Sequence, residues 1–204
     1  CGFGGNDSSL ILSMNKPEST CSAGGDYDIE IIADELITSA DDLKELKEFI
    51  SPMESRRMGK LQKAAHLSSL RAMKAAGTDC PDAIITATSR GMLEISMQFL
   101  EDIAANDEEL LKPTLFMQST HNTLSSAIAI RAKCHGYNTT YSQGDDSFRW
   151  AMRDAERLIK TGKAATVLVG SYDESTATFS EFAERAGKEA PQAIYARSIV
   201  LTRK

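Results

Sequence analysis

Long apolar runs are missing from this 204-residue sequence. A helix that crosses a bilayer needs roughly 20 consecutive apolar residues, so we expect no membrane span and no membrane partner. Cysteine is sparse, and its four copies, at positions 1, 21, 80 and 134, include no CxxC pair. This spacing argues against a zinc site and a disulfide scaffold, and it favours a reducing, cytoplasmic setting.

Concentrated positive charge is also missing. The formal net charge is −6, and no basic stripe stands out beyond Arg56, Arg57, Lys60 and Lys63. The composition therefore disfavours nonspecific nucleic-acid binding. Several catalytic fingerprints are absent too, namely GxGxxG after a strand, GxxxxGK[ST], HExxH and GxSxG. We therefore predict neither a bound cofactor nor a metal ion.

The most regular stretch is 136–174, where a strand, a polar turn, an amphipathic helix and a second strand follow one another. The helix has its apolar residues at steps of three and four, which places them on one face. They are Phe148, Ala151, Met152, Ala155, Leu158 and Ile159. Ser147 is the expected N-cap, and Gly162 closes the other end. The order predicts a βαβ unit.

The remaining pattern extends this unit to a full α/β domain. Further strands are expected at 27–37, 83–88 and 193–202. Helices are expected at 56–76, 92–105, 123–133 and 177–186, with a short acidic helix or loop at 41–50. About five strands with helical crossovers indicate a layered α/β sheet with right-handed connections.

Two polar turns lie at the starts of helices, where open α/β sheets usually place their sites. The candidate binding and catalytic residues are Ser119, His121, Asn122, Gln143, Asp145, Asp146 and Ser147. His121 is a candidate base toward a group bound near Asp145. In the alternative, Asp145 and Asp146 cap one helix, Ser119 or Thr120 caps the other, and His121 is a satisfied, partly buried imidazole.

Residues 1–25 differ from the rest of the chain. They comprise a glycine-rich turn, a short strand at 10–14 and a polar linker, whereas the regular pattern of the main domain covers 26–204. No initiator Met is present, which indicates a processed chain or an engineered one. Cys1 is compatible with a lipidated N-terminus, but no signal segment supports that interpretation.

The stretch 52–174 resembles the N-terminal half of a β-ketoacyl-acyl-carrier-protein synthase of the thiolase superfamily. Residues 53–60, followed by an Ala/Leu-rich helix, are similar to the first helix of that family. Residues 113–122 and the small-residue helix 124–132 resemble its dimer-forming segment. Residues 136–140, the helix 147–161 and the strand 165–174 match its nucleophile strand, its buried helix and the next strand. The resemblance implies a thiolase-like half-fold with a mixed sheet covered by helices on both faces.

Residues 3–12 resemble a different part of the same family, the last strand hairpin at the C-terminal end of a ketosynthase. Two interpretations stay open. The segment is the end of a synthase fused upstream, or it is a strand that completes the sheet of this domain.

The departures from the family decide the predicted function. Asp145 occupies the position of the acyl-accepting Cys, and the second half of the family, which supplies two histidines, has no counterpart in this sequence. A carboxylate is a poor thioester-forming nucleophile because its acyl product is a labile anhydride. We therefore predict that the chain is inactive alone as an acyltransferase.

Two functions follow from the resemblance. The first is a non-catalytic subunit of fatty-acid or polyketide-type biosynthesis, which pairs with a ketosynthase as a chain-length factor does, or docks acyl carrier protein. Its expected partners are a ketosynthase or a second copy, since the helix 147–161 lacks its usual second sheet, and docking would use Arg56, Arg57, Lys60 and Lys63. The alternative is a diverged enzyme with Asp145 and His121 as acid and base, although a helix N-terminus stabilises ionised carboxylates and makes them poor bases.

Overall fold

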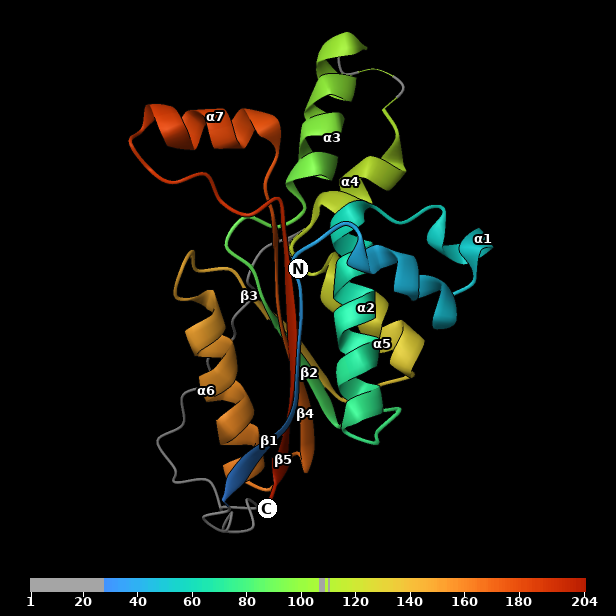
Figure 1. The fold of residues 1–204 in the computed structure, drawn as a ribbon, viewed down its shortest axis with the longest axis vertical. Coiled ribbons are helices and arrows are strands. Elements are labelled where there is room, and N and C mark those ends of the chain that lie inside the picture. The colour runs from blue at the N-terminus through green and yellow to red at the C-terminus, as the bar shows by residue number, and fades with distance from the viewer. Residues whose placement is uncertain (1–27, 107–108, 110) are drawn as a thin grey trace, which may run out of the picture.

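The computed structural model describes residues 28–106, 109 and 111–204, and these form one five-stranded mixed sheet (Figure 1). The strands are β1 (Ile29–Ile37), β2 (Ala83–Ala87), β3 (Tyr137–Tyr141), β4 (Thr166–Glu174) and β5 (Ile194–Arg203), in the order β1-β5-β4-β2-β3. β2 is parallel to both β3 and β4, whereas β5 is antiparallel to β4 and β1. The predicted α/β half-fold is confirmed. The segment 1–25 lies outside the described residues.

Helices cover both faces of the sheet, as predicted (Figure 1). Helix α2 (Lys60–Ala75) and helix α5 (Thr123–Ala132) pack on one face, and helix α6 (Ser147–Lys160) packs on the other. The alternation of side chains along β4 explains both contacts, since Leu168 and Tyr172 join the α2 core whereas Val167 and Val169 join the α6 core. The strands are therefore apolar on both sides, which is typical of a central layer.

The other helices surround this central layer. They are the 3-10 helix η1 (Asp42–Glu48), α1 (Pro52–Ser55), α3 (Leu93–Ala105), α4 (Pro113–Ser119) and α7 (Ala177–Arg185). Helices α3 and α7 extend past the end of the sheet where β4 stops (Figure 1). The hollow described below lies between them.

Two local predictions are wrong. The helix expected at 56–76 begins at Lys60, because Gly59 is extended at the N-cap and separates α2 from the short helix α1. The N-cap of α6 is Asp146 instead of Ser147, and the Asp146 side chain makes no capping hydrogen bond. Ser147 is already inside the helix and is buried.

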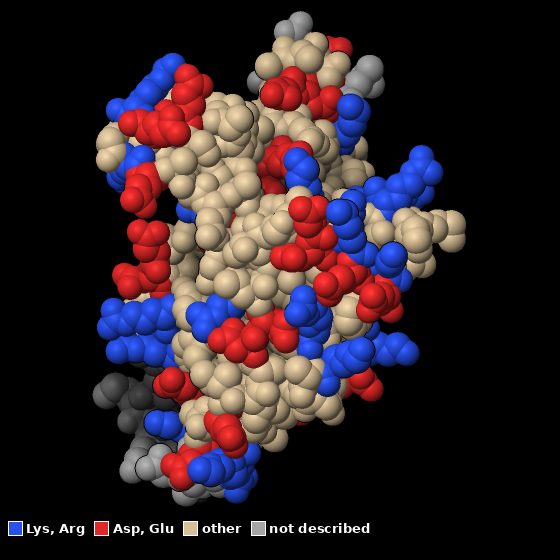
Figure 2. All heavy atoms as spheres, in the orientation of Figure 1, with Lys and Arg blue, Asp and Glu red and all other residues tan. Residues whose placement is uncertain are grey.

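The outward face of α6 is uncovered within the described residues, as expected, and it is mostly charged. Its exposed residues are Arg149, Trp150, Arg153, Glu156, Arg157 and Lys160. Basic side chains project from this side of the molecule (Figure 2). A face of this composition is well solvated, so α6 needs no second sheet to be stable in water.

Candidate functional site

The turn before α6 is held by the hydroxyl of Ser147. Its Oγ accepts a hydrogen bond from the amide of Gln143 at 2.7 Å and donates to the carbonyl of Thr88 at 2.9 Å or of Gly144 at 2.6 Å. Gly144 has a φ of +59°, a conformation that favours glycine. Ser147 therefore fixes the turn to the end of β2, and its predicted role as a binding residue is not tested by this contact.

The side chains of this turn point to solvent. Gln143, Asp145 and Asp146 are all exposed, and Asp146 lies 3.7 Å from Arg149 in a surface ion pair. Such a pair contributes little to stability. Asp145 is thus presented at the N-terminus of α6, where the helix dipole favours an anion.

The second predicted turn joins α4 to α5. Asn122 is the N-cap of α5 and makes no side-chain capping bond, so the suggested caps Ser119 and Thr120 are wrong. The Ser119 hydroxyl donates instead to the carbonyl of Phe116 at 2.8 Å. His121 is exposed, and its ring lies against Gly91, where an added Cβ would come within 3.1 Å of the imidazole Cδ2. The alternative of a partly buried His121 is therefore wrong as well.

Both turns contact one loop, which runs from Ser89 to Gly91 after β2. The Ser89 hydroxyl donates to the carbonyl of Gly144 at 2.8 Å, and the His121 ring lies next to Gly91. Across the described residues, however, no hydrogen bond or ion pair joins His121 to Asp145. The structure brings the two turns to the same loop without assembling an acid/base pair.

A buried carboxylate, Asp173, organises that loop. It accepts hydrogen bonds from the Thr88 hydroxyl at 2.9 Å, from the Ser89 amide at 3.0 Å and from the Arg90 amide at 2.8 Å. Asp173 was not among the site residues predicted from the sequence. The signal available was its place at the end of β4, because the carboxyl ends of the parallel strands β2 and β4 meet at one edge.

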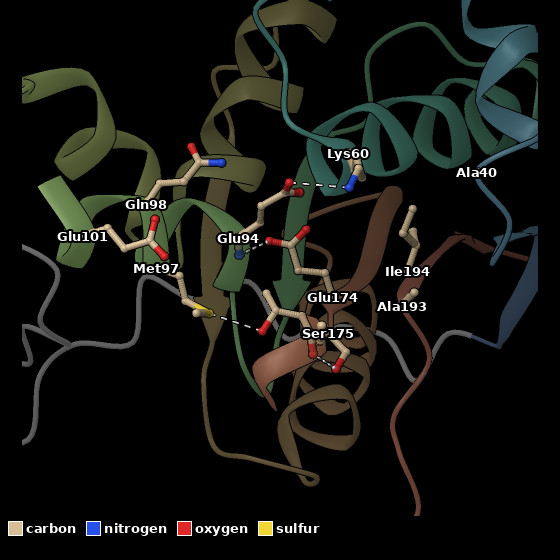
Figure 3. Close-up of a pocket in the computed structure, with 12 residues that line it drawn as sticks. Ala40, Lys60, Glu94, Met97, Gln98, Glu101, Glu174, Ser175, Ala193 and Ile194 are labelled. Atoms are coloured by element: carbon tan, nitrogen blue, oxygen red, sulfur yellow. Dashed lines mark hydrogen bonds and ion pairs between the residues drawn. The ribbon is translucent and has the colours of Figure 1, made fainter. Parts of the chain in front are cut away.

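The next residue, Glu174, reaches a hollow of about 460 Å³ between α3, α7 and the ends of β4 and β5 (Figure 3). Glu174 is buried and accepts a hydrogen bond from the amide of Glu94 at 2.8 Å. Burial raises the pKa of Glu174 above its ordinary range. Glu94 and Glu101 also line the hollow, and Lys60 lies 3.5 Å from Glu94. The hollow suits a hydrogen-bond donor or a cation better than an anion.

The four basic residues predicted to dock a carrier protein lie in the first turn of α2 and just before it. Arg56, Arg57 and Lys60 are exposed, and Lys63 is half-buried one turn into α2. Lys60 and Lys63 line a second hollow between η1, α1 and α2. Within the described ranges, no group of three or more His, Cys, Asp or Glu side chains is arranged to hold a metal ion, and no helix is long and apolar enough to cross a membrane.

Comparison with known protein families gives a match for this chain. The model of the β-ketoacyl synthase N-terminal domain matches residues 34–203, which is most of the chain. The chain belongs to the β-ketoacyl synthase N-terminal domain family. Comparison with curated proteins found no significant match to this synthase-like sequence.

Solved structures share the synthase-like fold. One is a ketosynthase in complex with its chain length factor from Xenorhabdus doucetiae, at 21% identity and a TM-score of 0.67, covering 86% of this chain and 79% of that chain. The ishigamide ketosynthase/chain length factor gives 19% identity, a TM-score of 0.68 and coverage of 86% and 62%. A β-ketoacyl synthase from Burkholderia phymatum gives 13% identity and a TM-score of 0.65, and the match covers 87% of this chain and 59% of that chain. This synthase-like chain therefore spans less than two thirds of the length of the ishigamide and Burkholderia proteins.

Proposed function

We propose that this chain is a non-catalytic β-ketoacyl synthase-like subunit of fatty-acid or polyketide-type biosynthesis, which pairs with an active ketosynthase in the manner of a chain length factor. The observation that carries the proposal is Asp145, which is exposed in the turn before α6. The resemblance assigns this position to the acyl-accepting Cys. Two similar structures, each described as a ketosynthase with its chain length factor, support the choice of partner.

The chemistry of Asp145 supports a role without acyl transfer. A carboxylate attacks a thioester poorly, and the mixed anhydride that it would form hydrolyses readily. A general acid/base role would need a proton partner within hydrogen-bond reach. No contact in the described part of the chain favours such a pair with His121, so we do not propose the acid/base alternative.

The pairing surface that we propose comprises α4, α5 and the edge strand β3. In the described sheet, β3 has a neighbour on one side only, and α5 contacts both β3 and α4. Exposed apolar side chains lie on all three elements, with Met117 68% exposed, Ile130 78% exposed and Tyr137 43% exposed. Exposed apolar side chains and an open strand edge are features that partners commonly cover.

We also propose that Arg56, Arg57, Lys60 and Lys63 attract an acidic carrier protein to the paired subunits. The chain as a whole is acidic, so a local basic surface is needed for such an encounter. Reversing the charge of Arg56 and Arg57 is expected to slow carrier binding. Unchanged binding would remove this part of the proposal.

Size-exclusion chromatography with light scattering tests the pairing. The pure chain is analysed alone and mixed with the ketosynthase encoded nearest to it, and a stable heteromer is expected. The double variant Met117→Glu and Ile130→Glu should weaken the heteromer by tenfold or more, because it buries charge in the interface.

The control is Phe182→Glu, which places one such charge on an exposed apolar position of α7, and each single variant, Met117→Glu and Ile130→Glu, is compared with it. We expect the Phe182→Glu variant to pair as the wild type does. Equal weakening by both sets of changes would show that the surface of α4, α5 and β3 is not the interface, and a chain that ignores the ketosynthase would contradict the proposed function itself.

A further inference from the structure

A hollow of about 300 Å³ lies between η1, α1 and α2, and every charged side chain that lines it is a lysine. Lys44 and Lys47 come from η1, whereas Lys60 and Lys63 come from α2. We call this hollow the lysine basin. Its volume is at the lower end of the range for small-molecule sites. Basic side chains project from this part of the molecule, with acidic ones among them (Figure 2).

Two of the four amines have acidic neighbours. Lys44 lies 2.9 Å from Asp41, but both side chains are mostly exposed, so the pair is weak and open to exchange. Lys60 lies 3.5 Å from Glu94 on the other side of the α2 N-terminus. Neither carboxylate lines the basin.

The other two amines, Lys47 and Lys63, have no ion pair within the described residues. Like charges around one hollow repel each other, although solvent screens the exposed ones, and a bound anion would remove this repulsion. Two uncompensated ammonium groups match the charge of a phosphomonoester, which is about −1.5 to −2 at pH 7. Lysine binds phosphate as a point charge, without the fixed geometry that a bidentate arginine imposes.

The remaining lining favours an organic ligand over a bare ion. Ala40, Leu43, Leu46 and Pro52 contribute apolar surface to the basin. An alkyl group attached to the phosphate would cover this surface and lose contact with water. A ligand with an anionic head and a short apolar portion therefore fits both parts of the lining.

We propose that the lysine basin binds a phosphomonoester of a small organic molecule. The phosphate would lie between Lys47 and Lys63, with Lys44 and Lys60 at the rim, and the organic portion would contact the apolar lining. Lys60 and Lys63 also belong to the carrier-docking surface proposed above, but the basin does not depend on pairing with a ketosynthase. A failure of one proposal is therefore distinguishable from a failure of the other.

The test is a ¹⁵N NMR titration of the isolated chain with n-butyl phosphate, inorganic phosphate and n-butanol. We expect n-butyl phosphate to shift the backbone amide resonances of Leu43 and Leu46 in a saturable way. Inorganic phosphate should do so with a higher dissociation constant, and n-butanol should cause no saturable shift. A specific site should be occupied at about 10 mM n-butyl phosphate, because even a weak site has a dissociation constant near 1 mM. If these amides do not shift at that concentration, the proposal is overturned.

The double variant Lys47→Gln and Lys63→Gln should weaken binding by tenfold or more, because it removes both charge-assisted contacts to the phosphate. Its matched control is Lys160→Gln and Lys163→Gln, which removes the same two charges from exposed positions at the end of α6. The control should bind within twofold of wild type. If both double variants weaken binding equally, the effect comes from the overall charge of the protein, and the proposed site is wrong.

A conservative variant guards against misfolding as the cause of lost binding. Lys47→Arg with Lys63→Arg keeps both charges and should retain most of the affinity. Loss of binding in this variant, with thermal melting unchanged, would contradict recognition by charge.

Discussion

The imidazole of His66 is buried on α2, and the charged side chains that act on it are Arg131 of α5 and Glu54 of α1. The residue is 2% exposed, and its Nδ1 donates to the carbonyl of Gln62 at 2.9 Å. Burial is the main cause that lowers the pKa of His66 to about 4 from its ordinary value of 6.5. The folded protein therefore keeps this side chain neutral well into the acid range.

This burial predicts a loss of stability in mild acid. The unfolded chain takes up a proton near pH 6.5, whereas the folded chain takes it up only near pH 4. Between these values the unfolded state binds more protons, so the free energy of unfolding falls as the pH drops, by about 3 kcal/mol at most. Urea unfolding at pH 7, 6, 5 and 4.5 measures this loss.

The variant His66→Gln should show a smaller loss over the same pH range, although it is less stable at pH 7. The variant His135→Gln removes an exposed histidine and should follow the wild-type curve. A His66→Gln curve parallel to wild type would exclude His66 as the source of the pH dependence.

At the scale of elements, the order of the strands and main helices could be predicted, because periodic helices such as α6 and apolar strands such as β2 and β4 alternate along the chain. The first residues of the helices were harder to predict. Four residues separate the expected start of α2 from its true start, since Arg56 and Arg57 suit a helix but the chain leaves the helix after Ser55 and is extended at Gly59. The cap of α6 was misplaced by one because Asp146 and Ser147 are both capping residue types.

The loop after β2 could not be predicted as part of the site. Asp173 meets Thr88, Ser89 and Arg90, which lie 83 to 85 residues earlier in the chain, only because β4 lies beside β2. A pattern within one segment carries no information on that contact. The predicted residues Asp145 and His121 were found near this loop, but their distance from each other depends on the same long-range packing.

The charged face of α6 leads to a prediction about this element. The double variant Arg149→Gln and Arg153→Gln should change the free energy of unfolding by no more than about 1 kcal/mol, because both side chains are exposed. It should also leave the heteromer with the ketosynthase intact. Urea unfolding and light scattering check the two parts, and a lost heteromer would show that the partner covers α6 after all.

At the scale of the whole molecule, the sheet is covered on both faces without a second half-fold. The α2 side holds the larger apolar core, and the α6 side ends in a solvated helix face. The surface that we propose a partner covers is the edge at β3 with α4 and α5. Neither hollow was predicted from the sequence, because each is lined by residues from several elements.

The measurement that tests the account most directly is native mass spectrometry of this chain mixed with its neighbouring ketosynthase and an acyl-thioester donor. We predict a heteromer that contains both chains, with the acyl group covalently attached to the ketosynthase alone. An acyl group on this chain, or two proteins that stay separate at micromolar concentrations, would contradict the proposal of a non-catalytic partner subunit.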